Sequence, residues 1–147
     1  MIELRDISIR KATEEELSAL IALDHVAEGD GDHRKSIEAA IRSDRTWTVR
    51  TSESIVGYGI ISHDFFSRTF IELIYIAEAE RSKGHGPKLI QFLESQTRTS
   101  DLFTSTNESN VHMQHVLEKL GYERSGVIHN LDPGDPEIVY IKRNLPT

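Results

Sequence analysis

Residues 71–89 read IELIYIAEAERSKGHGPKL, and this stretch determines more of the fold than any other part of the chain. Phe70 to Ala77 are nearly continuously apolar and rich in β-forming residues, which predicts a strand covered on both faces. A charged loop with two glycines, Arg81 to Gly86, follows, and apolar residues at helical spacing begin at Leu89. A strand, a glycine loop and a helix in succession are typical of an anion site, because amide N–H groups and the helix dipole converge there.

The spacing of the glycines excludes two common phosphate-binding loops. A P-loop requires G-x-x-x-x-G-K-[ST], and the run from Gly84 to Leu89 has neither that spacing nor the hydroxyl that binds magnesium. A dinucleotide-binding loop requires G-x-G-x-x-G, and Leu89 occupies the place of the third glycine. The pattern that remains is R-x-x-G-x-G, formed by Arg81, Gly84 and Gly86. Alone it is weak evidence, since a loop with two glycines is also an ordinary turn.

The flanking sequence predicts further strands and helices on both sides. The upstream elements are a strand over 7–11, a helix begun by the Thr13 and Glu16 capping box, a helix over 34–43 after the turn-forming EGDGDH, and hairpin strands 46–51 and 55–62. The downstream elements are a helix to about Arg98, a strand over 102–106, a helix from Met113 that stops at Gly121, and strands 122–128 and 137–142. This order is mixed α/β, and its central crossover favours a locally parallel strand pair.

Composition narrows the classes of function. The chain has 147 residues, and we expect one domain spanning residues 1–147. Its 17 Lys and Arg against 24 Asp and Glu give a net charge of -7, which opposes general binding to nucleic acid or anionic lipid. The absence of cysteine excludes disulfides and thiolate metal sites. MIELRDISIR lacks a signal-peptide core and no apolar run is long enough to span a bilayer, so we expect a soluble, cytoplasmic protein.

A second motif lies downstream at residues 110–122, NVHMQHVLEKLGY. This segment resembles the N-x-x-A-x-x-x-Y-x-K-L-G-F helix of the GNAT N-acetyltransferase superfamily, and IELIYIAEAERSKGHGPKL resembles the acetyl-CoA loop of the same superfamily. Two motifs in the right order and at the right separation are more specific than either alone. The resemblance implies an α/β fold of the mixed, α+β type, with a central, mostly antiparallel sheet, one parallel splayed pair and about four flanking helices.

The resemblance also implies which residues hold the cofactor. The backbone of the loop would wrap the pyrophosphate of CoA through Arg81, Ser82, Lys83, Gly84, His85 and Gly86. The backbone near Ile74 and Ile76 would pair with the pantetheine arm as an added strand does. Asn110 would contact the same arm, although asparagine is equally a favoured helix cap, and Asn107 is a weaker candidate of this kind. The expected co-substrate is acetyl-CoA, with a longer acyl-CoA left open, and no metal is expected.

Glu72 is the predicted catalytic base. It interrupts the apolar run FIELIYIA, where a buried carboxylate is costly unless it is partnered or functional, and some members of the superfamily use a glutamate at the matching place. A strand-edge or salt-bridged glutamate is the alternative interpretation. Leu117 stands where many members have the tyrosine that protonates the CoA thiolate, so the acid is unassigned. This departure keeps open a second hypothesis, a non-catalytic sensor or partner-binding module that binds acyl-CoA.

The main hypothesis is an N-acetyltransferase that uses direct attack in a ternary complex with a primary amine of a small molecule or peptide. The resemblance places two acidic segments at the acceptor entrance, which would favour a cationic amine, although Asp and Gly also serve turns. These residues are Asp24, Glu28, Asp30, Asp32, Asp132, Asp135 and Glu137. His112 and His115 share a helix face, but a metal site lacks a third ligand. We expect no nucleic acid and no membrane as partner, and a homodimer is left open.

Overall fold

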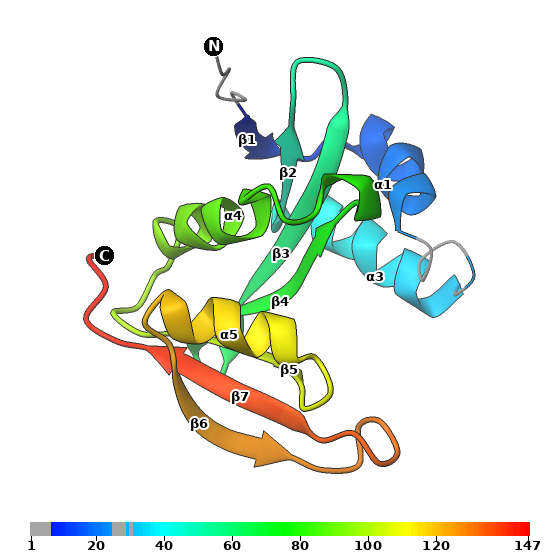
Figure 1. The fold of residues 1–147 in the computed structure, drawn as a ribbon. Helices are drawn as coiled ribbons and strands as arrows, with labels where there is room; N and C mark the ends of the chain where they lie inside the picture. The colour runs from blue at the N-terminus through cyan, green and yellow to red at the C-terminus, as the bar shows by residue number, and fades with distance from the viewer. Residues whose placement is uncertain (1–6, 25–28, 30) are drawn as a thin grey trace. The chain divides into compact units, whose positions relative to one another are not determined.

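The computed structural model describes residues 7–24, 29 and 31–147. Its strands are β1 (Ser8–Lys11), β2 (Thr46–Arg50), β3 (Ile55–Phe65), β4 (Arg68–Ile76), β5 (Leu102–Asn107), β6 (Glu123–Ile128) and β7 (Glu137–Lys142). Its helices are α1 (Leu17–Leu23), α3 (Gly31–Arg42), α4 (His85–Glu94) and α5 (Val111–Lys119), with 3-10 turns η1 (Glu14–Glu16) and η2 (Glu78–Glu80) (Figure 1). Among the described residues, the order of these elements is the one that the sequence predicts.

In the described part of the chain, seven strands join in one hydrogen-bonded sheet of order β1-β2-β3-β4-β5-β7-β6. The pair β4 and β5 is parallel, whereas β1 with β2, β2 with β3, β5 with β7 and β6 with β7 are antiparallel. The predicted fold class, a mixed α/β protein with a mostly antiparallel sheet and one parallel pair, is therefore confirmed. No helix in the described part of the chain is both long enough and apolar enough to cross a membrane.

The chain divides into two compact units, which are described separately below. The N-terminal unit comprises Met1–Ile61 and Leu73–Phe92, and the C-terminal unit comprises Ser62–Glu72 and Leu93–Thr147. Two of the boundaries between the units fall within the residue ranges of β3 and β4. The expectation of a single domain over residues 1–147 stays a prediction.

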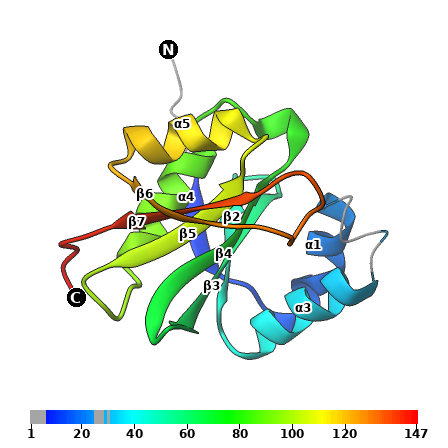
Figure 2. The ribbon, with the colours of Figure 1, turned by 90° about the horizontal axis from the view of Figure 1, so that it is seen from below.

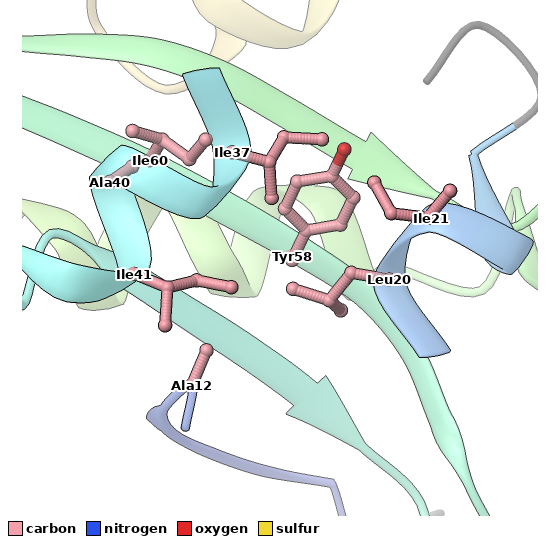
Figure 3. Packing of buried hydrophobic residues seen from close by; sticks show 8 residues of the cluster. All are labelled: Ala12, Leu20, Ile21, Ile37, Ala40, Ile41, Tyr58 and Ile60. Atoms are coloured by element: carbon pink, nitrogen blue, oxygen red, sulfur yellow. The ribbon is translucent and has the colours of Figure 1, made fainter. Parts of the chain in front are cut away.

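The N-terminal unit is built around a buried apolar cluster between β3 and helices α1 and α3 (Figure 3). The spacing of Ile37, Ala40 and Ile41 places all three on one face of α3, and each is at most 4% exposed. Tyr58 lies at the centre of the cluster with its ring fully buried. Burying a side chain of this size contributes about 1.5 to 3 kcal/mol, so the cluster fixes both helices against β3. Its members are Ala12, Leu20, Ile21, Ile37, Ala40, Ile41, Tyr58 and Ile60.

Helix α3 begins earlier than predicted. The sequence EGDGDH, residues 28–33, was expected to be turn, but the helix already includes Gly31, Asp32 and His33. The expectation was wrong here because Asp32 stands in the first turn, where a carboxylate complements the positive end of the helix dipole. Residues 28 and 30 of this segment lie outside the described residues.

In the C-terminal unit, α5 lies across the face formed by β5 and β7 (Figures 1 and 2). The side chain of Gln114 links this helix to the sheet, since its Nε2 donates to the carbonyls of Asn107 and Glu108 at 3.2 and 2.7 Å. Strand β6 is one of the two edge strands of the sheet, and all six of its residues are exposed.

Glu16 connects the first helical turn to the sheet. Its Oε1 accepts a hydrogen bond from the backbone N–H of Thr13 at 2.9 Å, which confirms the predicted capping box, and its Oε2 pairs with Arg50 of β2. Burial alone would raise the pKa of Glu16, but the hydrogen bonds from Thr13 and the charge of Arg50 hold it below its ordinary value. The ionised form is therefore the one that stabilises the fold.

We expect Glu16→Gln to lower the free energy of unfolding by about 1 kcal/mol near neutral pH. A pKa that is lower in the folded state stabilises above the unfolded-state pKa, and that contribution is lost as the pH falls through the folded-state value. Urea unfolding should therefore show a gap between variant and parent that narrows as the pH is lowered from about 5 to 2. The exposed neighbour Glu15, changed to Gln, is the control, and a gap independent of pH would contradict the assignment to charge.

Candidate functional site

The carboxyl half of β4 continues beyond its pairing with β5. The parallel register pairs Thr69, Phe70 and Ile71 with Leu102, Phe103 and Thr104, and β4 then runs on to Ile76. In this second half, Leu73 and Tyr75 pack against the buried cluster under α1 and α3. Because side chains alternate along a strand, Ile74 and Ile76 lie on the opposite face. The strand therefore has two chemically distinct sides where it leads into the glycine loop.

Gly57 on β3 allows the end of β4 to approach closely. A Cβ placed on Gly57 would lie 2.6 Å from both the carbonyl oxygen of Tyr75 and Cδ1 of Ile76, closer than real Cβ contacts. The neighbouring backbone bond, from the N–H of Ala77 to the carbonyl of Val56, is 2.8 Å long. Sequence reasoning missed this role, although a glycine within the apolar strand IVGYGIIS is a signal of close backbone approach.

The loop after β4 has a backbone suited to an anion. Ser82 and Gly84 adopt left-handed conformations, with φ of 65° and 85°, and α4 begins at the next residue, His85. Alternation of left-handed residues turns successive N–H groups toward one side, and the first N–H groups of a helix lack intrahelical partners. The loop therefore presents several N–H donors at the positive end of α4.

Arg81 is held at the start of this loop. Its Nε donates to the carbonyl of Ile76 at 2.8 Å, and its guanidinium lies 5.4 Å from the centre of the Tyr75 ring. The side chain thus ties the loop back to the end of β4 by a hydrogen bond and a cation–π contact. The sequence predicted Arg81 as a loop residue but gave no indication of this anchoring role.

Glu80 orders the basic side chains of the loop. Its Oε1 lies 3.4 Å from both Nζ of Lys83 and Nε2 of His85. Desolvation alone would raise the pKa of Glu80, but the hydrogen bonds and charges of Lys83 and His85 lower it. His85 is only 4% exposed, and its Nδ1 has no hydrogen-bond partner among the described residues. The ring of His85 is therefore a buried part of the loop, which the sequence did not indicate.

Helix α4 starts at His85 and so has Pro87 in its first turn, as expected, but it ends at Glu94 rather than near Arg98. The expected loop residues His85 and Gly86 are thus the first residues of the helix. A Cβ placed on Gly86 would lie 4.0 Å from Cγ1 of Ile76, an ordinary contact. The N-terminal unit therefore brings together Ile74, Ile76 and the run from Arg81 to Gly86, as the resemblance implies for one binding site.

A polar cluster lies near the face of β4 that carries Leu73 and Tyr75. Asp24, which follows α1, is 2% exposed, and its Oδ2 accepts a hydrogen bond from the hydroxyl of Tyr58 at 2.5 Å. The Nε2 of His33 on α3 lies 3.4 Å from the same oxygen. Burial, followed by the hydrogen bond and charge of Asp24, raises the pKa of Tyr58 far above its ordinary value. The sequence predicted Asp24 at the entrance for the acceptor but gave no indication of the roles of Tyr58 and His33.

Glu72 and Asn110 belong to the C-terminal unit. Glu72 is exposed, so the premise that it is a buried carboxylate is wrong: β4 is not covered on both faces at this position. Asn110 caps α5, where its Oδ1 accepts from the N–H of Met113 at 3.1 Å. The side chain of Asn107 instead binds the β6–β7 loop, since its Nδ2 donates to Oδ2 of Asp132 at 2.9 Å.

Leu117 is 2% exposed and belongs to the core of the C-terminal unit. Tyr122 is also buried, and its hydroxyl donates to Oε2 of Glu94 at 2.9 Å, while Nζ of Lys142 lies 3.1 Å from the same oxygen. Burial, together with the charge and hydrogen bond of Glu94, raises the pKa of Tyr122. Tyr122 is thus a packing residue, as predicted, and its hydroxyl donates to the Glu94 carboxylate, which also pairs with Lys142.

Two further features bear on the choice of site. Within residues 7–24, 29 and 31–147, no three His, Cys, Asp or Glu side chains are grouped to bind a metal, and His112 and His115 are exposed. A groove of about 530 Å³ in the C-terminal unit is lined mainly by phenylalanines 65, 66 and 103 and by β6. None of the predicted site residues lines that groove.

Comparisons with known proteins agree on one family. The profile of the acetyltransferase (GNAT) family matches residues 9–122. Acetyltransferase Atu2258 of Agrobacterium fabrum is 23% identical over 132 residues, covering 89% of this chain and 90% of the relative. The crystal structure of a GNAT-family acetyltransferase from Bacillus cereus ATCC 10987 superposes with a TM-score of 0.88 at 33% identity, over 96% of this chain and 99% of that one.

A more distant structure carries a ligand. An acetyltransferase of Bacillus anthracis, solved in complex with acetyl coenzyme A, superposes with a TM-score of 0.61 at 17% identity. The match covers 67% of this chain and 61% of that one, and it shows a shared fold.

Proposed function

Because this chain belongs to the acetyltransferase (GNAT) family, and is therefore an acyltransferase, we propose that it transfers an acetyl group from acetyl-CoA to a primary amine. The amine, of a small molecule or a peptide, attacks the thioester directly in a ternary complex. The observation that carries this proposal is the junction of β4 and α4, where Ser82 and Gly84 turn backbone N–H groups toward the positive end of a helix.

Two segments of the N-terminal unit make the donor site. The N–H groups from Arg81 to Gly86 bind the pyrophosphate of CoA, which the loop conformation and the helix dipole favour. The backbone of β4 near Ile74 and Ile76 binds the pantetheine arm, because this part of the strand lies beyond the residues that pair with β5. Asn110 contacts the same arm in this proposal, in addition to capping α5.

The acceptor must be a neutral amine when it attacks. For a lysine-like amine with a pKa near ~10.4, forming the free base at neutral pH costs about 4 to 5 kcal/mol, so a proton acceptor accelerates the reaction. We assign Glu72 to accept the proton that the ammonium form of the acceptor loses to become the neutral amine, on the strength of the family resemblance. Leu117 has no proton to give, and the CoA thiolate, whose thiol has a pKa near ~8.5, leaves and takes its proton from solvent.

Replacement of Glu72 by Gln should lower kcat about tenfold while acetyl-CoA affinity stays within about twofold, because the amide cannot accept the proton and the donor site is untouched. The initial rate of thiol release at saturating substrate gives kcat, and calorimetry gives the dissociation constant for CoA. The exposed Glu118 on α5, changed to Gln, is the control. A Glu72→Gln protein with unchanged kcat would remove Glu72 from the mechanism.

The function itself is tested by thiol release from acetyl-CoA with a panel of polyamines, aminoglycosides, amino acids and peptides. Amine-dependent release, with an acetylated product of matching mass, supports the proposal. A parallel series of longer acyl-CoA donors identifies the acyl group. CoA binding with no turnover across the panel would reject amine acetylation and favour the non-catalytic module that Leu117 leaves open.

A further inference from the structure

The imidazole of His85, the first residue of α4, is costly where it lies. Its side chain is 4% exposed, and its Nδ1 has no hydrogen-bond partner among the described residues. A buried polar atom without a partner lowers the free energy of unfolding, and an apolar side chain of similar size would avoid that loss. Histidine at this position therefore needs a compensating contact through its other nitrogen.

The other nitrogen of the ring contacts Glu80. Nε2 of His85 lies 3.4 Å from Oε1 of Glu80, whose lowered pKa keeps it ionised at neutral pH. Because an ionised carboxylate only accepts hydrogen bonds, Nε2 carries the hydrogen of this contact whether the ring is neutral or protonated. The contact joins the last residue of η2 to the first residue of α4. It therefore spans the glycine loop from one end to the other.

The backbone of the loop does not hold its own conformation. Ser82 and Gly84 are both left-handed, and for Ser82, which has a Cβ, this conformation is unfavourable. Within the described part of the chain, the backbone N–H groups of Ser82, Lys83 and Gly84 donate to no backbone carbonyl. Side chains therefore hold the loop, since Arg81 ties its start to the end of β4 and Glu80 reaches across it to α4.

Glu80 contacts the basic side chain in the middle of the loop through the same oxygen. Nζ of Lys83 lies 3.4 Å from Oε1 of Glu80, and the two side chains are 45% and 26% exposed. An ion pair so exposed contributes little by itself and does not fix its own geometry. The buried ring of His85 limits the positions open to the carboxylate, so the position of Lys83 depends on His85 as well.

Building on the proposed function, which assigns the pyrophosphate of CoA to this loop, we propose that His85 is a positioning residue of the donor site. Its Nε2–H holds the carboxylate of Glu80, and that carboxylate holds the loop and Lys83 in the arrangement that binds pyrophosphate. A loop that is ordered before its ligand arrives binds more tightly, because less conformational freedom is lost on binding. This role of the ring is separate from that of the backbone N–H of His85.

The proposal separates stability from CoA affinity. His85→Leu removes the unsatisfied Nδ1 together with the contact to Glu80, so urea unfolding should occur at the parental denaturant concentration or above it. Calorimetry should nonetheless show CoA bound about tenfold more weakly. His85→Gln keeps an N–H donor near the place of Nε2, and its CoA affinity should stay within about threefold of the parent. Loss of stability with parental CoA affinity in His85→Leu would show that the ring only packs the helix.

A double-mutant cycle tests whether His85 acts through Glu80. Glu80→Ala changes a partly exposed side chain, so this variant should fold, and it should bind CoA about tenfold more weakly than the parent. In the Glu80→Ala background, His85→Leu should change CoA affinity less than about twofold, because the contact that it removes is already absent. Glu78→Ala, at an exposed acid of the same 3-10 turn, is the control. Additive losses, or parental CoA affinity in Glu80→Ala, would overturn the role.

A truncated donor provides a third measurement. S-acetylpantetheine has the thioester and the pantetheine arm but no pyrophosphate, so its KM should change less than about twofold in His85→Leu, whereas the KM for acetyl-CoA should rise about tenfold with kcat unchanged. Equal rises for both donors would overturn the role of His85. If the unmodified protein binds CoA but acetylates no amine, the proposed function fails, and the CoA affinities of the variants still decide the role of His85.

Discussion

A Gly84→Val protein is expected to bind CoA more than about 100-fold more weakly than the parent, a loss of about 2.7 kcal/mol. Gly84 has a φ of 85°, a region that costs a residue with a Cβ roughly 1 to 2 kcal/mol and a β-branched residue more. The surroundings of Gly84 are open, since a Cβ added there would meet no atom within 4 Å, so the side chain causes no steric clash in the unbound fold. The penalty therefore falls on the loop conformation and on the approach of the pyrophosphate.

Two variants separate these contributions. Gly84→Asn keeps the left-handed conformation at low cost, so it should weaken CoA binding less than valine does. Gly134, in the loop between β6 and β7, also has a left-handed φ, 73°, with open surroundings, and Gly134→Val introduces the same strain away from the donor site. Calorimetric titration with CoA gives the three affinities. A folded Gly84→Val protein that binds CoA as the parent does would reject the phosphate-binding role of the loop.

Local patterns in the sequence predicted the elements well because each depends on neighbours along the chain. The capping box of Thr13 and Glu16 forms as predicted, and the apolar stripe before Gly121 gives a helix that ends there, with Gly121 at a φ of 96°. The run 137–142 is strand β7 with the predicted bounds. The glycine spacing became informative only together with the downstream motif, and the family match then confirmed the class of enzyme.

The remainder depends on contacts between distant segments, which spacing does not encode. Asp24, His33 and Tyr58 meet from three elements, and only the buried tyrosine in IVGYGIIS, which needs a hydrogen-bond partner, hinted at the cluster. For Glu72, the local sequence pattern predicted the wrong burial. Its apolar neighbours predicted a covered strand, but coverage is set by what packs on the sheet, and the side chain is exposed.

Replacement of Gly57 by Ala is expected to lower the free energy of unfolding by about 3 kcal/mol, the upper range for overpacking, because the added Cβ meets backbone. The methyl carbon would lie 2.6 Å from the Tyr75 carbonyl oxygen and from Cδ1 of Ile76. The isoleucine side chain can rotate, but the carbonyl belongs to β4 and moves only if the strand moves. Urea unfolding measures the loss, with Gly126→Ala on β6, where nothing lies within 4 Å, as the control.

The same substitution links stability to the donor site. Arg81 donates to the carbonyl of Ile76, so a shift of the end of β4 away from Gly57 also displaces the anchor of the glycine loop. We therefore expect the folded fraction of Gly57→Ala to bind CoA more weakly than Gly126→Ala does. A destabilised Gly57→Ala protein with parental CoA affinity would show that the loop keeps its conformation independently of β4, and that the tie through Arg81 is dispensable for binding.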